Sequence, residues 1–479
     1  MKHATLYCKV LFFLTIASMQ SLSTAQDKSI PISPSSQLFV DDTLVAKKAN
    51  VVRHIHPCTK LDQPVVTADM PWERDEQDLR VYIYGTVLRD PETGHFRMWY
   101  NRLNLVLFAE SEDGIHWTRP TLGLNDWQGS TANNIVYSGL HSPSVLYNPE
   151  AKDPDFCYVM MGSSKGYRFF HSRDGVHWTP CADTPAFTGG DTCTLSYDAK
   201  TGEYLAFHKR SHDYRGHPRR LVYLSTSRDL KTWSEPVLAM APDEIDDAAV
   251  VKEGGQYSQF YNMSAFPYGG QFLGMITHFR FTGSSQNHET QQSRHDGPID
   301  VQLVTSRNGR SWTRCEDRSP VIPNGPYPYD AGCILGVANS PVVVNDELWL
   351  YYTAITTTHG GALPGKKISI ALAKWRKDGF VSLDAGNDEG VVETVHMSCA
   401  GGSLIVNADI KETMSIAILN KSGTSIPEFD HSDCNVLSGD SIHHTVTWKK
   451  HDKMPVDHSV CLQFRMKNAR LYGFSIKND

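Results

Sequence analysis

The segment SEDGIHWTRP, residues 111–120, decides the fold, because the chain repeats its pattern. Close copies are SRDGVHWTP at residues 172–180, SRDLKTW at 227–233 and SRNGRSW at 306–312, and a shortened copy, KDGF, lies at 377–380. Ser and Asp side chains accept hydrogen bonds from nearby backbone N–H groups and glycine adopts a positive φ, so the pattern predicts a tight turn. The Trp predicts a large ring buried beside that turn.

The spacing of the copies indicates a repeat architecture. Their acidic or amide positions are Asp113, Asp174, Asp229, Asn308 and Asp378, at intervals of 61, 55, 79 and 70 residues. Residue order and spacing recur together, which five unrelated turns would not produce. We therefore read each copy as the end of one structural unit.

Each unit also contains a predicted hairpin, in which two apolar runs flank a turn rich in Asp, Asn, Gly or Pro. The five hairpins span residues 86–100, 144–160, 194–208, 264–278 and 341–353. A third run and the Trp-bearing turn complete a four-stranded unit. Five such units predict a five-bladed β-propeller, in which closure of the ring protects the strand edges.

The predicted fold class is all-β, with a second domain after the repeats end. From about residue 390 the repeated pattern stops, but segments such as SLIVNA and HTVTW still alternate apolar and polar residues. We assign residues 26–390 to the propeller, including an N-terminal hairpin, and residues 391–479 to a small C-terminal β-sandwich. Asp41 and Asp42 in that hairpin are interpreted as solvated acids near a turn.

Residues 1–25 have the pattern of a cleavable signal peptide. Lys2 and Lys9 provide positive charge, VLFFLTIASM at residues 10–19 is apolar, and small residues precede residue 26. No later run reaches eighteen consecutive apolar residues, so no membrane span is expected. The sequence predicts a secreted or periplasmic protein.

Composition excludes several classes of function. Removing residues 1–25 leaves 44 basic and 53 acidic residues, a net charge of −9, which argues against binding to nucleic acid. Nine cysteines remain, none in a CxxC pair, and we interpret them as scattered core residues rather than a zinc site. The chain contains no Gly-rich nucleotide loop and no G-x-S-x-G segment, so neither a cofactor nor a metal is expected. The oligomeric state does not follow from the sequence.

Alignment of the hairpins selects one candidate carboxylate. The equivalent turn residues are Asp90, Asn148, Asp198 and Asn345, and seven positions earlier stand Ile83, His141, Asp191 and Ala338. Only Asp191 in that second set is an acid. It is either a catalytic group at the entrance of the channel or a cap that orders the loop before the third unit. Asp90, although part of an Arg-Asp-Pro triplet, is interpreted as a turn residue.

Two further acids precede first strands in predicted entrance loops. Glu73 follows Trp72, whose ring can stack on a sugar, and Asp330 lies near Tyr327 and Tyr329. Each is either a functional acid or a solvated loop residue.

The predicted rim of the channel is polar. The predicted substrate-binding residues are Trp72, His208, Arg210, Asn262, His278 and Arg280. The segment KRSHDYRGHPRR, residues 209–220, is read as a basic loop that either binds sulfate or carboxylate groups or is simply solvated.

The order of the motifs LFVDD, PWE, GT, RMWY and SxDGxxW resembles secreted bacterial proteins grouped with the five-bladed propeller glycosidases, the superfamily of glycoside hydrolase families 32 and 43. The resemblance covers most of the mature chain, including the C-terminal sandwich. It implies cleavage of glycosidic bonds by a trio of carboxylates: Glu73 as proton donor or nucleophile, Asp191 as base or stabiliser, and Asp330 as their partner. The chain lacks the Trp-Met-Asn-Asp-Pro and Glu-Cys motifs, which argues against a plain invertase or levanase.

The functional hypothesis is a secreted glycoside hydrolase that acts on a neutral or anionic poly- or oligosaccharide, its expected partner. One alternative is a non-catalytic propeller that binds glycans through Trp72 and Tyr84. Another is a sialidase-like hydrolase, which requires Arg80, Arg210 and Arg280 to converge on a carboxylate.

Overall fold

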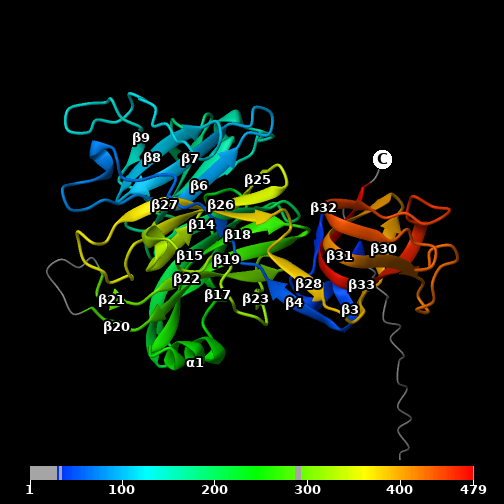
Figure 1. Ribbon diagram of the computed structural model, residues 1–479. Coiled ribbons are helices and arrows are strands. Elements are labelled where there is room, and N and C mark those ends of the chain that lie inside the picture. Colours follow the sequence, from blue (N-terminus) through cyan, green and yellow to red (C-terminus); the bar gives the residue numbers. More distant parts are fainter. Residues whose placement is uncertain (1–29, 32–34, 286–292, 478–479) are drawn as a thin grey trace, which may run out of the picture.

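The computed structural model describes residues 30–31, 35–285 and 293–477. In this part of the chain the protein is nearly all-β, with 33 strands, one α-helix and four short 3₁₀ helices. The strands form a larger body and a smaller one, which contains the C-terminal strands (Figure 1). Residues 1–25, the predicted signal peptide, lie outside the described residues.

Three four-stranded antiparallel sheets follow one another along the chain. The first contains β6 (Tyr82–Arg89), β7 (Phe96–Arg102), β8 (Leu105–Ser111) and β9 (Ile135–Ser138). The second contains β10 (His141–Tyr147), β11 (Tyr158–Ser163), β12 (Tyr167–Ser172) and β13 (Thr179–Pro180). The third contains β14 (Cys193–Asp198), β15 (Glu203–Tyr214), β16 (His217–Ser227) and β17 (Val237–Met240).

A nine-stranded sheet continues the series. Its first part is β18 (Tyr257–Tyr268), β19 (Gln271–Phe281), β22 (Ile299–Ser306) and β23 (Thr313–Arg314). Its second part is β24 (Cys333–Val337), β25 (Val342–Val344), β26 (Glu347–Ile355), β27 (Ile368–Arg376) and β5 (Thr59–Lys60). The two parts are linked by one parallel pair, Ile299 with Cys333.

The sheets are arranged in a ring. The first strands contact one another in the cycle β6, β10, β14, β18, β24 and back to β6. Because β5 comes from the N-terminal side of the chain and pairs with β27, the last part of the ring is built from segments far apart in sequence.

The repeated turns form as expected in four copies. In the first copy Asp113 Oδ1 accepts hydrogen bonds from the backbone N–H groups of Ile115 and His116, each at 2.8 Å, and Gly114 has a φ of 73°. The turn packs against the neighbouring sheet, because the Tyr351 hydroxyl on β26 donates to the Gly114 carbonyl at 2.7 Å. The repeated motif therefore joins one sheet to the next around the ring.

The same contact recurs in the second copy, where Trp99 of the first sheet donates to the Gly175 carbonyl at 2.7 Å. The shortened fifth copy differs. There Asp378 itself has a φ of 63°, and its carboxylate accepts from the hydroxyls of Tyr268 and Ser36. Without the Ser and Trp of the full motif, this copy makes a different turn.

The smaller body is a ten-stranded sheet that includes both ends of the described chain. Its C-terminal strands are β28 (Val381–Ala385), β29 (Gly390–Thr394), β30 (Met397–Ala400), β31 (Ser403–Leu419), β32 (Leu437–Thr445) and β33 (Val456–Lys477). Its N-terminal strands are β1 (Ile30–Pro31), β2 (Gln37–Leu38), β3 (Val45–Ala49) and β4 (Val51–Ile55). A separate apolar core lies within this body.

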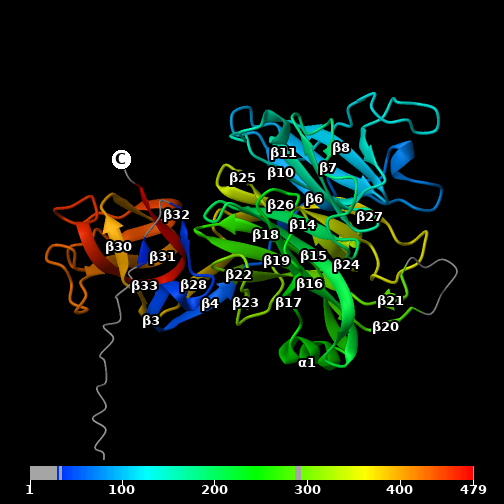
Figure 2. The same ribbon diagram turned by 180° about the vertical axis from the view of Figure 1, so that it is seen from behind.

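This pairing differs from the predicted division of the chain. The sequence predicts an N-terminal hairpin within the propeller, but over these residues β3 pairs with β29 and β4 pairs with β28. Strand β28 itself lies before residue 390, yet it pairs with β33. Pairing between strands more than 300 residues apart leaves no signal in a local hydrophobic pattern. Figure 2 shows β3 and β4 beside the C-terminal strands from the other side.

The remaining elements are short. They are η1 (Asp42–Leu44), η2 (Pro71–Glu73), η3 (Pro154–Phe156), η4 (Pro328–Asp330), the pair β20 (Gly283–Ser284) with β21 (His295–Asp296), and α1 (Glu244–Lys252). Asp243 caps α1, its carboxylate accepting from the backbone N–H groups of Ile245 and Asp246. In the part of the chain that the structure describes, no helix is long and apolar enough to cross a bilayer.

Candidate active site

A polar cavity of about 290 Å³ lies where the first strands of the sheets meet. We call it the Asp191 pocket. Its polar and aromatic lining residues are Arg80, Tyr82, Tyr84, His141, Asp191, Lys209, Arg220, Tyr261, Ser293, His359 and Lys366. They come from β6, β10, β15, β16 and β18 and from loops that separate these strands. Segments distant in sequence therefore converge on one space.

Asp191 lies in the loop before β14, with 59 % of its side chain exposed. The loop is held at its backbone: the Ser142 hydroxyl donates to the Asp191 carbonyl at 2.9 Å, and the Gly190 N–H donates to the Lys209 carbonyl at 2.8 Å. A Cβ at residue 190 would come within 2.9 Å of that carbonyl oxygen, which explains the glycine. The loop thus presents one carboxylate to the cavity.

The Asp191 carboxylate forms an ion pair with Lys209. The pocket walls partly withdraw the Asp191 carboxylate from bulk water, which by itself raises its pKa, but the charge and hydrogen bond of Lys209, with a smaller effect of His141, lower this pKa to about 2. Asp191 is consequently ionised at neutral pH. It is suited to act as a base or to stabilise positive charge, and not to donate a proton.

Four cations line the pocket, and Asp191 is the one acid among the described residues of the lining. Arg80 is paired with Asp78, and Lys209 with Asp191. Lys366, only 6 % exposed, donates to the His359 carbonyl at 2.6 Å, and burial lowers its pKa. The fourth cation, Arg220, donates to the Gln259 side-chain oxygen at 2.7 Å. The lining therefore carries a net positive charge.

Aromatic and imidazole groups complete the lining. The rings of Tyr82 and Tyr84 stack with centroids 5.5 Å apart, and His141 meets both edge-on. Burial raises the pKa of Tyr82 to about 12 and lowers the pKa of His359 to about 3, so both groups are neutral at pH 7. Flat aromatic faces beside hydrogen-bonding groups suit a sugar ring.

Glu73 does not line this pocket. It ends η2, is fully buried, and accepts hydrogen bonds from the Tyr100 hydroxyl and from the backbone N–H groups of Asp69 and Met70, at 3.0 and 3.1 Å for the last two. Its carboxylate is also paired with Arg119. These contacts hold the loop before β6.

Asp330 has a similar environment in η4. It is fully buried, pairs with the Lys60 ammonium at 2.6 Å, and accepts from the Tyr352 hydroxyl at 2.9 Å. It too is absent from the lining of the Asp191 pocket. The structure therefore does not bring Glu73, Asp191 and Asp330 together, because two of them are enclosed in separate loops.

The predicted substrate-binding residues also lie outside the lining. Trp72 donates to the Asn134 side chain at 2.6 Å and contacts Trp127 edge-on. His208 and His278 are buried, at 1 % and 4 % exposure.

Three polar residues of that set bind other parts of the protein. Arg210 donates to the Thr188 carbonyl, Arg280 pairs with Glu253 and Asp300, and the Asn262 backbone bonds to Thr277.

Alternation of side chains along the strands explains these differences. On β15, Lys209 faces the pocket while its neighbours His208 and Arg210 do not, and on β18 Tyr261 takes that place instead of Asn262. Successive side chains of a strand point to opposite faces, so an error of one residue moves a prediction to the wrong side. His141, which aligned with Asp191 among the hairpins, carried the signal for a second lining residue.

The segment 209–220 is a hairpin rather than a loop. Strands β15 and β16 continue their pairing to Tyr214 and His217, and Arg215 and Gly216, with φ of 52° and 78°, make the two-residue turn. We call residues 209–220 the arm. One of its strands supplies Lys209 to the pocket and the other supplies Arg220.

Two other cavities, of about 300 and 580 Å³, lie between the ring and the C-terminal sheet. Their charged residues include Arg376, which is paired with Asp440. Within the described residues, no group of three or more His, Cys, Asp or Glu side chains is placed to hold a metal ion.

Comparison with known proteins finds distant likenesses among solved structures. No protein family model and no curated protein matches the chain. Among solved structures, an N-acetylgalactosamine deacetylase from F. plautii is 17 % identical, with a TM-score of 0.43, over 68 % of this chain and 96 % of its own. A glycosyl hydrolase from Bacteroides ovatus is 13 % identical, with a TM-score of 0.41, over 68 % and 97 %. A fructofuranosidase from Schwanniomyces occidentalis is 9 % identical, with a TM-score of 0.40, over 88 % and 98 %. Likenesses at this level assign neither fold nor activity.

Proposed function

We propose that the protein is a secreted glycoside hydrolase that cleaves an anionic poly- or oligosaccharide in the Asp191 pocket. The observation that supports this proposal is the convergence of one ionised carboxylate, four cations and stacked tyrosine rings on a single cavity. The tyrosine faces suit the sugar ring, and the cations suit a carboxylate or sulfate on it.

In this proposal Asp191 acts as the base that activates water, or stabilises the positive charge that develops on the sugar ring. The leaving oxygen requires a proton, and Lys366 is the lining group suited to donate it. Its buried ammonium has a lowered pKa, which makes it a stronger acid than an exposed lysine. Arg220 and Arg80 bind acidic groups of the substrate.

Glu73 and Asp330 keep a supporting role in the proposal. Both carboxylates are fully buried and paired with cations, Arg119 and Lys60. We infer that they order the loops before β6 and β24 and do not touch the substrate.

We also propose that the ring of sheets is a five-bladed β-propeller, with two blades in the nine-stranded sheet, and that the ten-stranded sheet is the C-terminal β-sandwich. The single bridge between β22 and β24 supports this division. The proposed chain order is a signal peptide at residues 1–25, the propeller within residues 26–390, and the sandwich from residue 391, completed by β3, β4 and β28.

A binding module without catalysis is the second candidate. The observation that favours it is that Asp191 is the only carboxylate among the described residues that line the pocket, whereas most glycoside hydrolases use two. The sialidase-like alternative is weaker, because Arg80 lines the pocket but Arg210 and Arg280 do not.

Product release from a panel of neutral, sulfated and uronate-containing oligosaccharides tests the proposal. The mature protein is compared with Asp191→Asn and with Asp183→Asn, which changes an exposed acid outside the pocket. We expect release by the wild type and Asp183→Asn from acidic substrates, and none by Asp191→Asn. Binding without release by all three proteins supports the binding module, and equal release by all three removes Asp191 from the mechanism.

A further inference from the structure

A second cavity, of about 410 Å³, adjoins the Asp191 pocket. We call it the arm cavity. Asp191, Lys209 and Arg220 line both cavities, so the two spaces meet at these three side chains. Beyond them the arm cavity is lined by other residues of the arm, including Ser211, and by Gln259 and His295.

The arm forms a wall of this cavity. Ser211 and Arg220 are directly paired across β15 and β16, and Lys209 lies two residues before Ser211. Side chains at alternate positions of a strand share a face, so these three point to the same side. Arg219 precedes Arg220 on β16 and also borders the cavity, but its side chain is only 1 % exposed.

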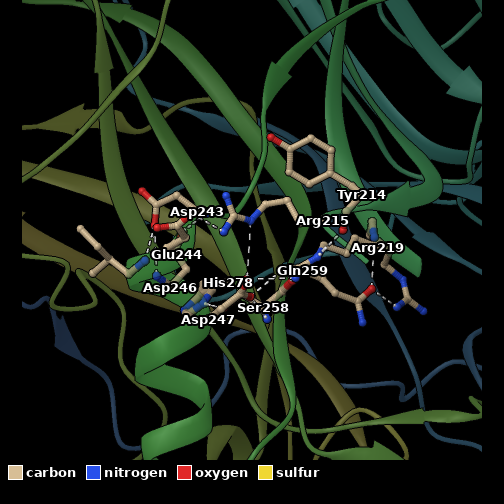
Figure 3. A network of polar contacts seen from close by, with 12 residues as sticks. Tyr214, Arg215, Arg219, Asp243, Glu244, Asp246, Asp247, Ser258, Gln259 and His278 are labelled. Carbon is tan, nitrogen blue, oxygen red and sulfur yellow. Dashed lines mark hydrogen bonds and ion pairs between the residues drawn. The ribbon is translucent and has the colours of Figure 1, made fainter. Parts of the chain in front are cut away.

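Arg219 fixes the arm to the body of the protein. Its guanidinium pairs with both oxygens of Asp247 on α1, at 2.6 and 2.9 Å, and donates to the Ser258 carbonyl on β18 at 2.8 Å. At the tip of the arm, Arg215 pairs with Glu244 at 3.0 Å. Figure 3 shows this network between the arm, α1 and β18. The wall of the arm cavity is therefore held in place before any ligand binds.

Arg220 differs from the neighbouring cations of the arm in its charged partners. Lys209 is paired with Asp191, and Arg219 with Asp247. Arg220, in contrast, has no carboxylate at ion-pair distance among the described residues; it donates to Gln259 and contacts His295, and it lies over the rings of Tyr261 and Phe279. Arg220 thus supplies an uncompensated positive charge at the junction of the two cavities.

We propose that the two cavities bind adjacent sugar units of one acidic chain, with the linkage between the units at Asp191 and with Arg220 bound to a carboxylate or sulfate on the unit in the arm cavity. This inference rests on the proposed function and specifies which cavity binds each sugar unit of the substrate. Ligand pockets in proteins have volumes of about 300–1,000 Å³. The Asp191 pocket, at about 290 Å³, and the arm cavity, at about 410 Å³, lie at the lower end of this range, so each suits one sugar unit and not an oligosaccharide. The Ser211 hydroxyl and His295 provide polar contacts for the second unit.

Binding as a function of chain length tests the inference. The probes are galacturonate, digalacturonate and trigalacturonate, and a sulfated galactose series of the same lengths, measured by calorimetry with the mature Asp191→Asn protein so that nothing is cleaved. Ser211→Trp fills the arm cavity. The matched control is His212→Trp, which adds the same ring on the opposite face of the arm, and thermal unfolding verifies that both variants fold.

We expect the dimer of one series to bind about tenfold or more tightly than its monomer. Ser211→Trp is expected to remove the affinity advantage of the dimer over the monomer, while His212→Trp leaves this advantage unchanged. The series that responds identifies carboxylate or sulfate as the acidic group.

Equal affinity for monomer and dimer overturns the inference, as does a dimer advantage that Ser211→Trp leaves unchanged. Either result leaves the proposed function standing if the monomer binds. If neither series binds at any length, the proposed anionic substrate itself is wrong.

Discussion

The carboxylate of Asp191 and the ammonium of Lys209 form an ion pair at the junction of the two cavities, although one residue lies in the loop before β14 and the other on β15. Lys209 also lies over the ring of Tyr261, 4.1 Å from its centroid. The ion pair and the ring contact together hold the Lys209 side chain in place. The protonation state of Asp191 therefore depends on Lys209.

Replacing Lys209 tests that dependence through the pH profile. In the wild type the pKa of Asp191 is lowered to about 2, so the carboxylate stays ionised in mildly acidic solution. Lys209→Met removes the cation but leaves the burial that raises this pKa. We expect the acid limb of the rate profile to move to higher pH in the variant. An unchanged acid limb, measured on folded protein, contradicts the assignment of Asp191 as the titrating base.

Arg220→Gln tests recognition of the acidic group. Because no carboxylate of the described residues pairs with Arg220, its charge is available to a ligand, and we expect affinity for an acidic oligosaccharide to fall by about tenfold. The salt dependence of binding should weaken as well. Titrations at two salt concentrations measure both effects. A neutral oligosaccharide is the control, and an equal loss for neutral and acidic ligands points to a disturbed fold.

Lys60→Met tests the buried pair that includes Asp330. The two side chains are 3 % and 0 % exposed, so removal of the lysine leaves a buried carboxylate without its cation. We expect the free energy of unfolding to fall by about 3–5 kcal/mol, as measured by denaturant titration. The double variant Lys60→Met with Asp330→Asn should lose less, since the unpaired charge is gone. A double variant that is stable but inactive would instead support a catalytic role for Asp330.

Glu73→Gln separates a supporting role from a catalytic one. The carboxylate of Glu73 accepts two backbone hydrogen bonds and faces Arg119, which in the variant keeps only the longer ion pair with Asp69, at 3.9 Å. We expect lower stability with turnover retained per folded molecule. Rates normalised to the folded fraction, with unfolding followed by circular dichroism, provide the measurement. A loss of turnover at unchanged stability means that Glu73 takes part in the reaction.

Acid stability tests the repeated turns. Backbone hydrogen bonds from Thr232 and Lys231 lower the pKa of Asp229 to about 2, whereas an unfolded aspartate has a pKa of about 3.9. A lowered folded pKa contributes stability above the unfolded pKa, and this contribution is lost as the pH falls from about 4 to about 2. Asp229→Asn should therefore flatten the decline of stability in this interval.

The fourth copy of the turn shows that an amide oxygen can accept the same backbone hydrogen bonds as the carboxylate. Asn308 accepts from the backbone N–H groups of Arg310 and Ser311 at 2.8 Å each, as Asp229 does with Lys231 and Thr232. Loss of stability in Asp229→Asn that is equal at pH 7 and pH 3 would mean that geometry, not charge, sets the contribution of the aspartate.

Local chemistry was readable from the sequence. The repeated turns, the hairpins before them and the all-β class follow from hydrogen-bonding side chains, glycine and alternating patterns that lie within a few residues of one another. Asp191 was found because equivalent hairpins could be aligned and only one of them placed an acid at the selected position.

Contacts between residues that are far apart in the sequence could not be predicted. Arg80, Arg220, Tyr261 and Lys366 meet in one pocket although up to 286 residues separate them, and no local pattern predicts that meeting. Strand register also escaped prediction, since His208 and Lys209 are equally polar and only the pleat decides which faces the cavity. Burial was the third unknown: Glu73 and Asp330 have the same residue type as a catalytic acid, and only their enclosing partners distinguish them.

The pairing of β5 with β27 bears on how the chain is made. The Thr59 side chain bonds to the Lys374 carbonyl, 315 residues further along, and β3 and β4 likewise pair with β29 and β28. During synthesis residues 45–60 leave the ribosome long before their partner strands. Strands β3, β4 and β5 therefore have no partners until synthesis is almost complete. The first strands to emerge are among the last to be paired, which makes nascent chains stalled before residue 374 the place to look for captured folding intermediates and for binding of chaperones.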